Sequence, residues 1–292
     1  MSKKGREKAV RVGGSKRTAA EIGKSALAFA LFLIYMIPFL LVVINSFKRK
    51  ISIVKTPLQL VDDDGPQFEN YSNAFVDMDF FRAFGNSLFV VSCSVALLIV
   101  LSSMCAYILV RKNYFACKVS FLLLISYMVV PFQVIMIPLL SIYGSTFNML
   151  NSRITLILMN FGFGTCFAVF LCHGFIKTGV PLALEEAAII DGCGPIQTFF
   201  KIVFPLLKPI LSTIAILQVL GLWNDYLLPS LVLVRPKLHT LPIAIRTFVG
   251  TFSSDYGNMM AALVMTVVPV IIVYIALQKY IIGGVVAGAV KS

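Results

Sequence analysis

Long apolar stretches separated by polar ones dominate this chain. Six of them have about 20 residues or more, enough for a helix to cross a hydrocarbon core of about 30 Å. Unpaired backbone groups are too costly in lipid, so each stretch is predicted to be a helix. The six predicted spans are 25–44, 88–109, 119–143, 154–175, 210–234 and 259–282.

The composition also indicates a membrane protein. Hydrophobic residues make up 59% of the 292 residues and charged residues 13%, whereas about a quarter of a typical soluble domain is charged. We therefore expect an all-α integral membrane protein with a single membrane domain, residues 25–283. A basic tail, 1–24, precedes this domain, and a short tail, 284–292, follows it.

The distribution of Lys and Arg indicates the orientation, because basic residues are retained on the cytoplasmic side. With the N-terminus inside, 16 of the 25 basic residues fall on the inner side, and both termini are predicted to be cytoplasmic. Lys48, Arg49 and Lys50 depart from this rule, since they follow the first span on its outer side. Half of the net charge of +12 lies in the N-terminal tail, where anionic lipid headgroups explain it better than nucleic acid does.

The inner loop 177–208 is the most informative polar stretch, and it is long for a connector. Residues at helical spacing predict a short helix over 181–190, which Gly192 terminates. Pro195 suits the first turn of a second short helix, which Pro205 is predicted to end. Four apolar residues of the second helix form a stripe that is expected to pack on the membrane domain: Ile196, Phe199, Phe200 and Val203. Two short helices joined by a glycine turn would form a rigid knob.

This loop resembles the cytoplasmic coupling loop, or E-A-A motif, of ABC importer permease subunits. Phe204 stands where that motif usually has Leu, and Cys193 where it usually has Ala. The resemblance implies that the loop contacts an ATPase through a set of residues that match or flank the motif: Glu185, Glu186, Ala187, Ala188, Asp191, Gly192 and Phe199.

The three acidic residues of this set, Glu185, Glu186 and Asp191, are expected to meet basic residues of the ATPase. The alternative is that Glu186 and Asp191 only solvate the loop or pair with Lys177 or Lys201. The complete spaced pattern, and not only its charges, favours the coupling role.

The resemblance extends over nearly the whole chain and is greatest to the maltose-permease type of carbohydrate importer subunit. The segments that carry it, besides the loop, are 68–71, 86–87, 130–133, 221–226, 241–242 and 288–292. It implies the type I ABC importer permease fold, with six transmembrane helices, in a bacterial or archaeal cell membrane. The implied substrate is a carbohydrate, an oligosaccharide in particular, although related permeases also carry polyol phosphates.

The same resemblance implies partners. They are a second, different permease subunit, two copies of an ABC ATPase that bind Mg-ATP, and an extracellular or periplasmic solute-binding protein. This chain itself is expected to be no enzyme and to hold no cofactor and no metal.

Polar residues in the predicted spans are candidates for the transport path. Asp225 is the only acidic residue in any predicted span, and such a carboxylate faces protein or water. Asn224 is polar as well, while Trp223 and Tyr226 offer aromatic faces to sugar rings. The alternative for Asp225 is that it caps a neighbouring helix or pairs with Arg235.

Gln133 and Asn160 are further path candidates in the third and fourth spans, with hydrogen bonding between helices as the competing explanation. Pro131 and Pro138 are predicted to kink the third span, and the glycines of 162–164 to loosen the fourth. Breaks of this kind are also expected around a transport path.

Other function classes fit less well. Segment 18–25 nearly spells a phosphate-binding loop, but the first glycine and a preceding strand are missing, so ATP is expected to bind another subunit. An ion-coupled secondary transporter, the main alternative, would show several intramembrane ionisable groups or a doubled helix set. A membrane enzyme would need clustered carboxylates or metal ligands. The six cysteines contain no C-x-x-C pair, which argues against a zinc site or a disulfide framework.

Overall fold

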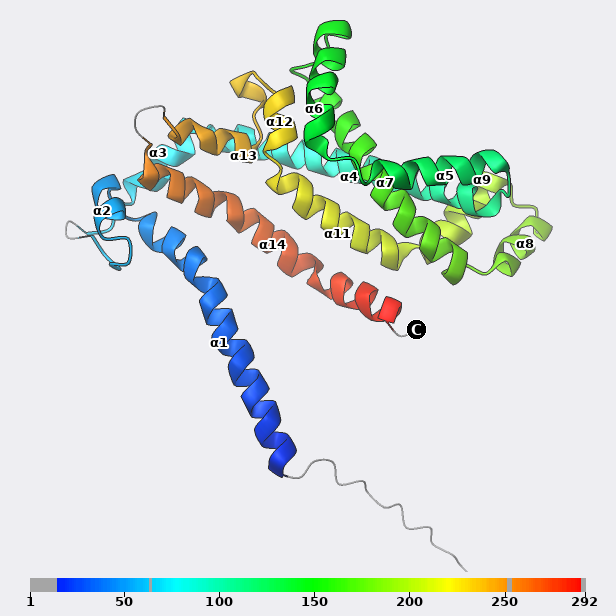
Figure 1. Ribbon diagram of the computed structural model, residues 1–292, viewed down its shortest axis with the longest axis horizontal. Coiled ribbons are helices and arrows are strands. Elements are labelled where there is room, and N and C mark those ends of the chain that lie inside the picture. Colours follow the sequence, from blue (N-terminus) through cyan, green and yellow to red (C-terminus); the bar gives the residue numbers. More distant parts are fainter. Residues whose placement is uncertain (1–14, 63–64, 251–253, 290–292) are drawn as a thin grey trace, which may run out of the picture.

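The computed structural model describes residues 15–62, 65–250 and 254–289, so most of the predicted N-terminal tail lies outside it. Every regular element in these ranges is a helix (Figure 1). The α-helices are α1 (Ser15–Asn45), α2 (Lys50–Lys55), α3 (Glu69–Asp77), α4 (Phe80–Arg111), α5 (Phe115–Tyr127), α6 (Phe132–Leu140), α7 (Arg153–Gly179), α8 (Leu182–Ile190), α9 (Pro195–Thr198), α10 (Phe204–Leu206), α11 (Lys208–Asn224), α12 (Leu227–Val232), α13 (Leu241–Ala244) and α14 (Tyr256–Ala289). Two π-helical turns, η1 (Ser141–Thr146) and η2 (Phe199–Val203), and two 3₁₀ turns, η3 (Pro236–Leu238) and η4 (Ile245–Phe248), complete the set.

Three described helices are long and apolar enough to cross a membrane unbroken: the Glu21–Asn45 part of α1, α4 and α7. Two further spans are long enough only if two helices that meet at a bend are counted together. The α5 helix is bent by 100° from the α6–η1 segment, and α11 by 74° from the segment Pro195–Leu206. In α14, the described apolar stretch is Tyr256–Ile272. Breaks inside the apolar stretches therefore distinguish this fold from a simple bundle of straight helices.

The third predicted span is broken near one of its two prolines, Pro131. The α5 helix ends at Tyr127, and Pro131 has extended backbone angles, φ −63° and ψ 135°, as the residue before α6. Proline has no N–H to donate and disfavours helical geometry in the residue before it, so the chain leaves the helix here. Pro138 lies within α6 and does not end it.

The fifth predicted span, 210–234, is also interrupted. The α11 helix ends at Asn224, and Asp225 has extended angles, φ −70° and ψ 123°. A new short helix, α12, begins at Leu227. The prediction of one continuous helix was wrong for this stretch, and its only carboxylate lies at the break.

The core is built on α4 and α7, which pack on each other over a longer stretch than any other two elements. Small residues permit this approach: Ala106 on α4 and Ala168 on α7 are fully buried in the same apolar cluster. Where Gly164 faces Leu98, a Cβ atom would lie 3.0 Å from Leu98 Cδ1. Close approach of two helices through small residues is how membrane helices gain packing energy.

The first span stands apart from this core. None of the apolar window of α1 is buried within the chain (Figure 1). Its C-terminal end is held by a polar cluster, in which Asn70 Nδ2 donates to the carbonyl oxygens of Ser46 and Lys48 at 2.8 and 3.0 Å. Lys48 itself is 1% exposed and donates from Nζ to Thr56 O at 2.9 Å. This basic residue is therefore part of a folded turn after α1.

Substitution of Gly164 by valine should destabilise the protein, because the new side chain would force Leu98 to move within a packed interface. Overpacking of this kind costs about 1–3 kcal/mol. The matched control is Gly162→Val on the same helix, where an added Cβ meets no heavy atom within 4 Å. Differential scanning fluorimetry of the two variants in detergent should show a lower unfolding midpoint for Gly164→Val. Equal midpoints would contradict the packing described here.

Candidate functional site

A polar cavity of about 440 Å³ lies where α6, α7, α11 and α12 meet. Four of its lining residues have side chains that can hydrogen-bond: Gln133, Asn160, Gln218 and Asp225. Aromatic rings from α6 and α7 complete the wall, namely Phe132, Phe163 and Phe167. Three of the six residues predicted for the transport path are thus brought together, although they come from segments far apart in the sequence.

Asp225 reaches this cavity because the helix ends there. Its Oδ1 atom accepts a hydrogen bond from the backbone N–H of Leu227 at 3.0 Å, which caps the first turn of α12. A hydrogen bond of the kind that the capping alternative predicts is therefore present, one residue before the N-cap Tyr226. In the described ranges, no basic residue forms an ion pair with Asp225, so the pairing with Arg235 is not found. One carboxylate both caps a helix and faces the cavity.

Asn160 has a second contact besides the cavity. Its Nδ2 atom donates to Ser94 Oγ on α4 at 3.3 Å, so the expected hydrogen bond between helices exists. Asn160 is 5% exposed, whereas Gln133 on α6 is exposed. Gln218 was missed by the sequence analysis. Its signal was the same as that of the other two amides, an uncharged polar residue inside an apolar span.

Trp223, Asn224 and Tyr226 are not among the residues that line this cavity. The Trp223 ring is 5% exposed and packs edge-on against Phe84, with 5.8 Å between the ring centroids. Asn224 donates to the carbonyl oxygen of Leu220, and the Tyr226 ring lies under the guanidinium of Arg246. The expectation that Trp223 presents a face to a sugar is therefore wrong for this cavity.

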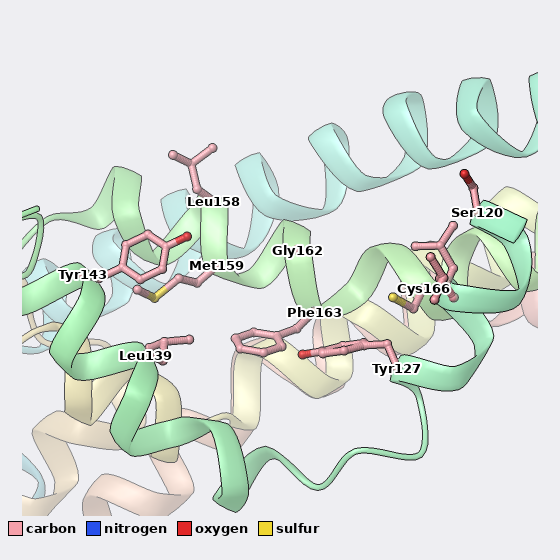
Figure 2. A pocket seen from close by; sticks show the side chains of 11 residues that line it. Ser120, Tyr127, Leu139, Tyr143, Leu158, Met159, Gly162, Phe163 and Cys166 are labelled. Atoms are coloured by element: carbon pink, nitrogen blue, oxygen red, sulfur yellow. The ribbon is translucent and has the colours of Figure 1, made fainter. Parts of the chain in front are cut away.

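A second cavity, of about 580 Å³, lies between α5, the α6–η1 segment and α7 (Figure 2). Its lining is mostly apolar, with hydroxyl groups from Ser120, Tyr127 and Tyr143 and no amide or charged side chain. Phe163 lines both cavities and separates the apolar space from the polar one. The polar cavity is the better candidate for a hydrophilic ligand, since it alone offers amides and a carboxylate.

The predicted knob in loop 177–208 is present. The first short helix is α8, and the chain leaves it through Gly192, whose φ of +83° suits glycine. Pro195 is the first residue of α9, as predicted. Pro205 does not end the second helix. It lies in the first turn of α10, where its missing N–H is tolerated, and the sharp bend follows at Leu207.

The apolar stripe of the second helix is only half buried. Phe199 and Val203 are 3% and 0% exposed and pack with the α4–α7 core. Ile196 and Phe200 are exposed, and so is Ile190 at the tip of α8, at 85%. Apolar side chains exposed on a polar loop are typical of a protein contact surface.

Glu185 and Glu186 are neighbours with opposite surroundings. Glu186 is exposed on α8, as are Ala187 and Asp191, whereas Glu185 is 4% exposed. The Glu185 carboxylate forms an ion pair with Arg111, 2.6 Å from its Nη2 atom. The expectation that Glu185 meets a partner protein is therefore wrong, because its carboxylate faces the chain's own core.

Ala188 and Phe199, also expected to contact an ATPase, are likewise buried in the chain, whereas the acidic Glu186 and Asp191 are exposed. Ala188 is buried against the body, 5% exposed, on the same side as Glu185. In the described part of the chain, neither Glu186 nor Asp191 forms an ion pair, so the alternative pairing with Lys177 or Lys201 is not found. The exposed surface of the knob is therefore acidic at two points and apolar at its tip.

Comparison with known proteins agrees with this arrangement. Residues 98–286 match the family model described as binding-protein-dependent transport system inner membrane component. A probable starch degradation products transport system permease protein, AmyC of Thermoanaerobacterium thermosulfurigenes, is 36% identical over 91% of this chain and 95% of its own length. The melibiose/raffinose/stachyose import permease protein MelC of Bacillus subtilis is 36% identical over 88% of this chain and 92% of its own length.

A solved structure shares the fold. It is a bacterial ABC transporter involved in the import of the acidic polysaccharide alginate, and one of its chains superimposes with a TM-score of 0.77 at 22% identity, covering 93% of this chain and 99% of that chain. The overall fold of this chain is thus a known architecture. The chain belongs to the family of binding-protein-dependent transport system inner membrane components, the permease subunits of ABC importers.

Proposed function

We propose that this chain forms half of the translocation path of an ATP-driven importer for a neutral carbohydrate, an oligosaccharide in particular. The observation that carries the proposal is the polar cavity, where three amides and one carboxylate face a space walled by phenylalanine rings. Sugar hydroxyls donate and accept hydrogen bonds, and amides offer both functions while a carboxylate accepts. The names of the similar permeases, which refer to starch degradation products and to melibiose, raffinose and stachyose, support the same substrate class.

The charge of the cavity favours a neutral sugar over a polyol phosphate. Binding of a phosphate group calls for Arg, Lys or a helix N-terminus directed at it. The first residues of α6 and α12 line the cavity, but no basic side chain does. The Asp225 carboxylate, its only charged group, already accepts from the first N–H of α12. A carboxylate would repel a phosphate, whereas it accepts hydrogen bonds from hydroxyl groups.

The knob on α8 and α9 is proposed to transmit the movement of ATPases on the cytoplasmic side. Its exposed surface carries Glu186 and Asp191 next to the apolar Ile190 and Ile196. Acidic points beside exposed apolar side chains suit a basic groove on a partner. In this proposal, two copies of the ATPase bind Mg-ATP, a second permease completes the path, and a solute-binding protein delivers the sugar from outside. Both termini of this chain are then cytoplasmic.

Replacement of Asp225 by asparagine tests the cavity. Asparagine still caps a helix, so α12 should persist, but the charged acceptor is lost. Hydrogen bonds to charged groups contribute about 1.5–3 kcal/mol, so uptake of the sugar should fall about tenfold or more. The assay is uptake of radiolabelled oligosaccharide into proteoliposomes that contain the whole importer. The neighbouring variant Asn224→Ala, outside the cavity, should transport normally. Wild-type uptake by Asp225→Asn would place the path elsewhere.

Charge reversal at Glu186 tests the coupling surface. Glu186→Lys should reduce the amount of ATPase that co-purifies with this chain and abolish uptake, because an exposed attractive charge becomes repulsive. The control is Glu69→Lys, the same change at an exposed position of α3, at the opposite end of the molecule (Figure 1). Quantitative mass spectrometry of the purified complexes gives the readout. Equal ATPase recovery from both variants would refute the assignment of this surface.

A further inference from the structure

The buried carboxylate of Glu185 on α8 is bonded to two side chains of α4. Arg111, in the last turn of α4, donates to Glu185 Oε1 from Nε at 2.8 Å and from Nη2 at 2.6 Å. Tyr107, one turn earlier on α4, donates from its hydroxyl to Oε2 at 2.8 Å. Both carboxylate oxygens are therefore bonded to α4, although Glu185 belongs to α8.

The same arginine also holds the end of α7. Its Nη2 atom donates to the carbonyl oxygen of Val180 at 2.8 Å, the residue that follows the last turn of α7. The Tyr107 ring meets the ring of Phe199, with 5.4 Å between the centroids. Two side chains of α4 therefore contact the end of α7, α8 and the second helix of the knob.

Burial makes this attachment specific. A desolvated carboxylate is very unfavourable unless it is paired and hydrogen-bonded. Glu185 is 4% exposed, and its two oxygens have the three donor contacts just described. The α8 helix therefore has one favoured position against the end of α4, and a shift of α8 alone would strip the carboxylate of its partners.

The position of Glu185 relative to the exposed surface gives this attachment a function. Glu186, the next residue on α8, is exposed where an ATPase is proposed to bind. Along the chain, α8 is joined to α7 through Val180 and Pro181 and to α9 through the turn at Gly192. Neither link bonds α8 to α4, so the side chains that reach from α4 to α8 are what ties the two helices directly.

We propose that Arg111 is a positioning residue that makes α8 move with α4, so that displacement of the knob reaches the α4–α7 pair and, through it, the polar cavity. This inference rests on the proposed function, since it assumes that an ATPase displaces α8. From α4, contacts lead on to the cavity through α7. Ser94 on α4 accepts a hydrogen bond from Asn160, and Leu98 on α4 packs against Gly164. Asn160 and Gly164 both line the cavity. Tyr107 supports the attachment through its bond to the same carboxylate.

The test is Arg111→Met in the complete importer, with its partner subunits, in proteoliposomes. Methionine retains an apolar stem but removes the guanidinium. The amount of co-purified ATPase should stay at the wild-type level and ATP hydrolysis should continue, while sugar uptake falls at least tenfold. The number of sugars transported per ATP hydrolysed therefore drops. Arg111→Lys, which retains the charge, should restore part of this ratio.

Two further variants make the test sharp. Lys112→Met removes the neighbouring charge, which is exposed and forms no ion pair with the described residues, and it should transport normally. Tyr107→Phe removes one hydrogen bond to the carboxylate without a change of charge, and it should lower the ratio about two- to fivefold. If Arg111→Met does not insert into the membrane, Tyr107→Phe serves as the test. An unchanged number of sugars transported per ATP in Tyr107→Phe would then overturn the proposal.

Other outcomes separate the possible failures. Wild-type uptake by Arg111→Met would overturn the inference. Loss of the ATPase from the Arg111→Met complex in parallel with uptake would also overturn it, since Arg111 would then only maintain the docking surface. Failure of Glu186→Lys to affect ATPase recovery would instead contradict the proposed function, whatever the result at Arg111.

Discussion

The close packing of α4 on α7 is the interaction on which both functional regions depend. Midway along the pair, Gly164 admits Leu98, and Asn160 donates to Ser94 at the wall of the cavity. At the end of the pair next to the knob, Arg111 on α4 donates to the carbonyl oxygen of Val180, which follows α7. Because apolar side chains gain little from leaving lipid for protein, such contact relies on small residues and on a few hydrogen bonds. The α4–α7 pair thereby contacts the cavity midway along its length and the knob at one end.

The breaks in the apolar segments have a common physical explanation. Irregular backbone is tolerated at membrane depth only where it is buried in protein or lines a cavity. Here α6 begins after Pro131 and α11 ends before Asp225, and residues next to both breaks line the same polar space. Asp225 satisfies a freed backbone N–H at the start of α12. The breaks thus bring two of the four hydrogen-bonding side chains, Gln133 and Asp225, to the cavity.

Features that depend on local sequence were predictable. The helix α8, its end at Gly192 and the start of α9 at Pro195 follow from residues a few positions apart. The helix faces were not predictable, because a span that is apolar on all sides does not reveal which side is buried. Trp223 was therefore predicted for the path and Gln218 overlooked, whereas Gln218 lines the polar cavity and Trp223 is buried and does not line it. The inward orientation of Glu185 depends on Arg111, 74 residues away in the sequence.

An ATP-driven carbohydrate importer and an ion-coupled transporter differ in their energy source. The energy source of uptake is therefore the most direct measurement. The importer, purified with its partners, is reconstituted with radiolabelled oligosaccharide and solute-binding protein outside and Mg-ATP enclosed. Ionophores then dissipate the proton and sodium gradients. Uptake should continue with ATP despite the ionophores and stop without ATP. Uptake that needs an ion gradient and proceeds without ATP would contradict an ATP-driven mechanism.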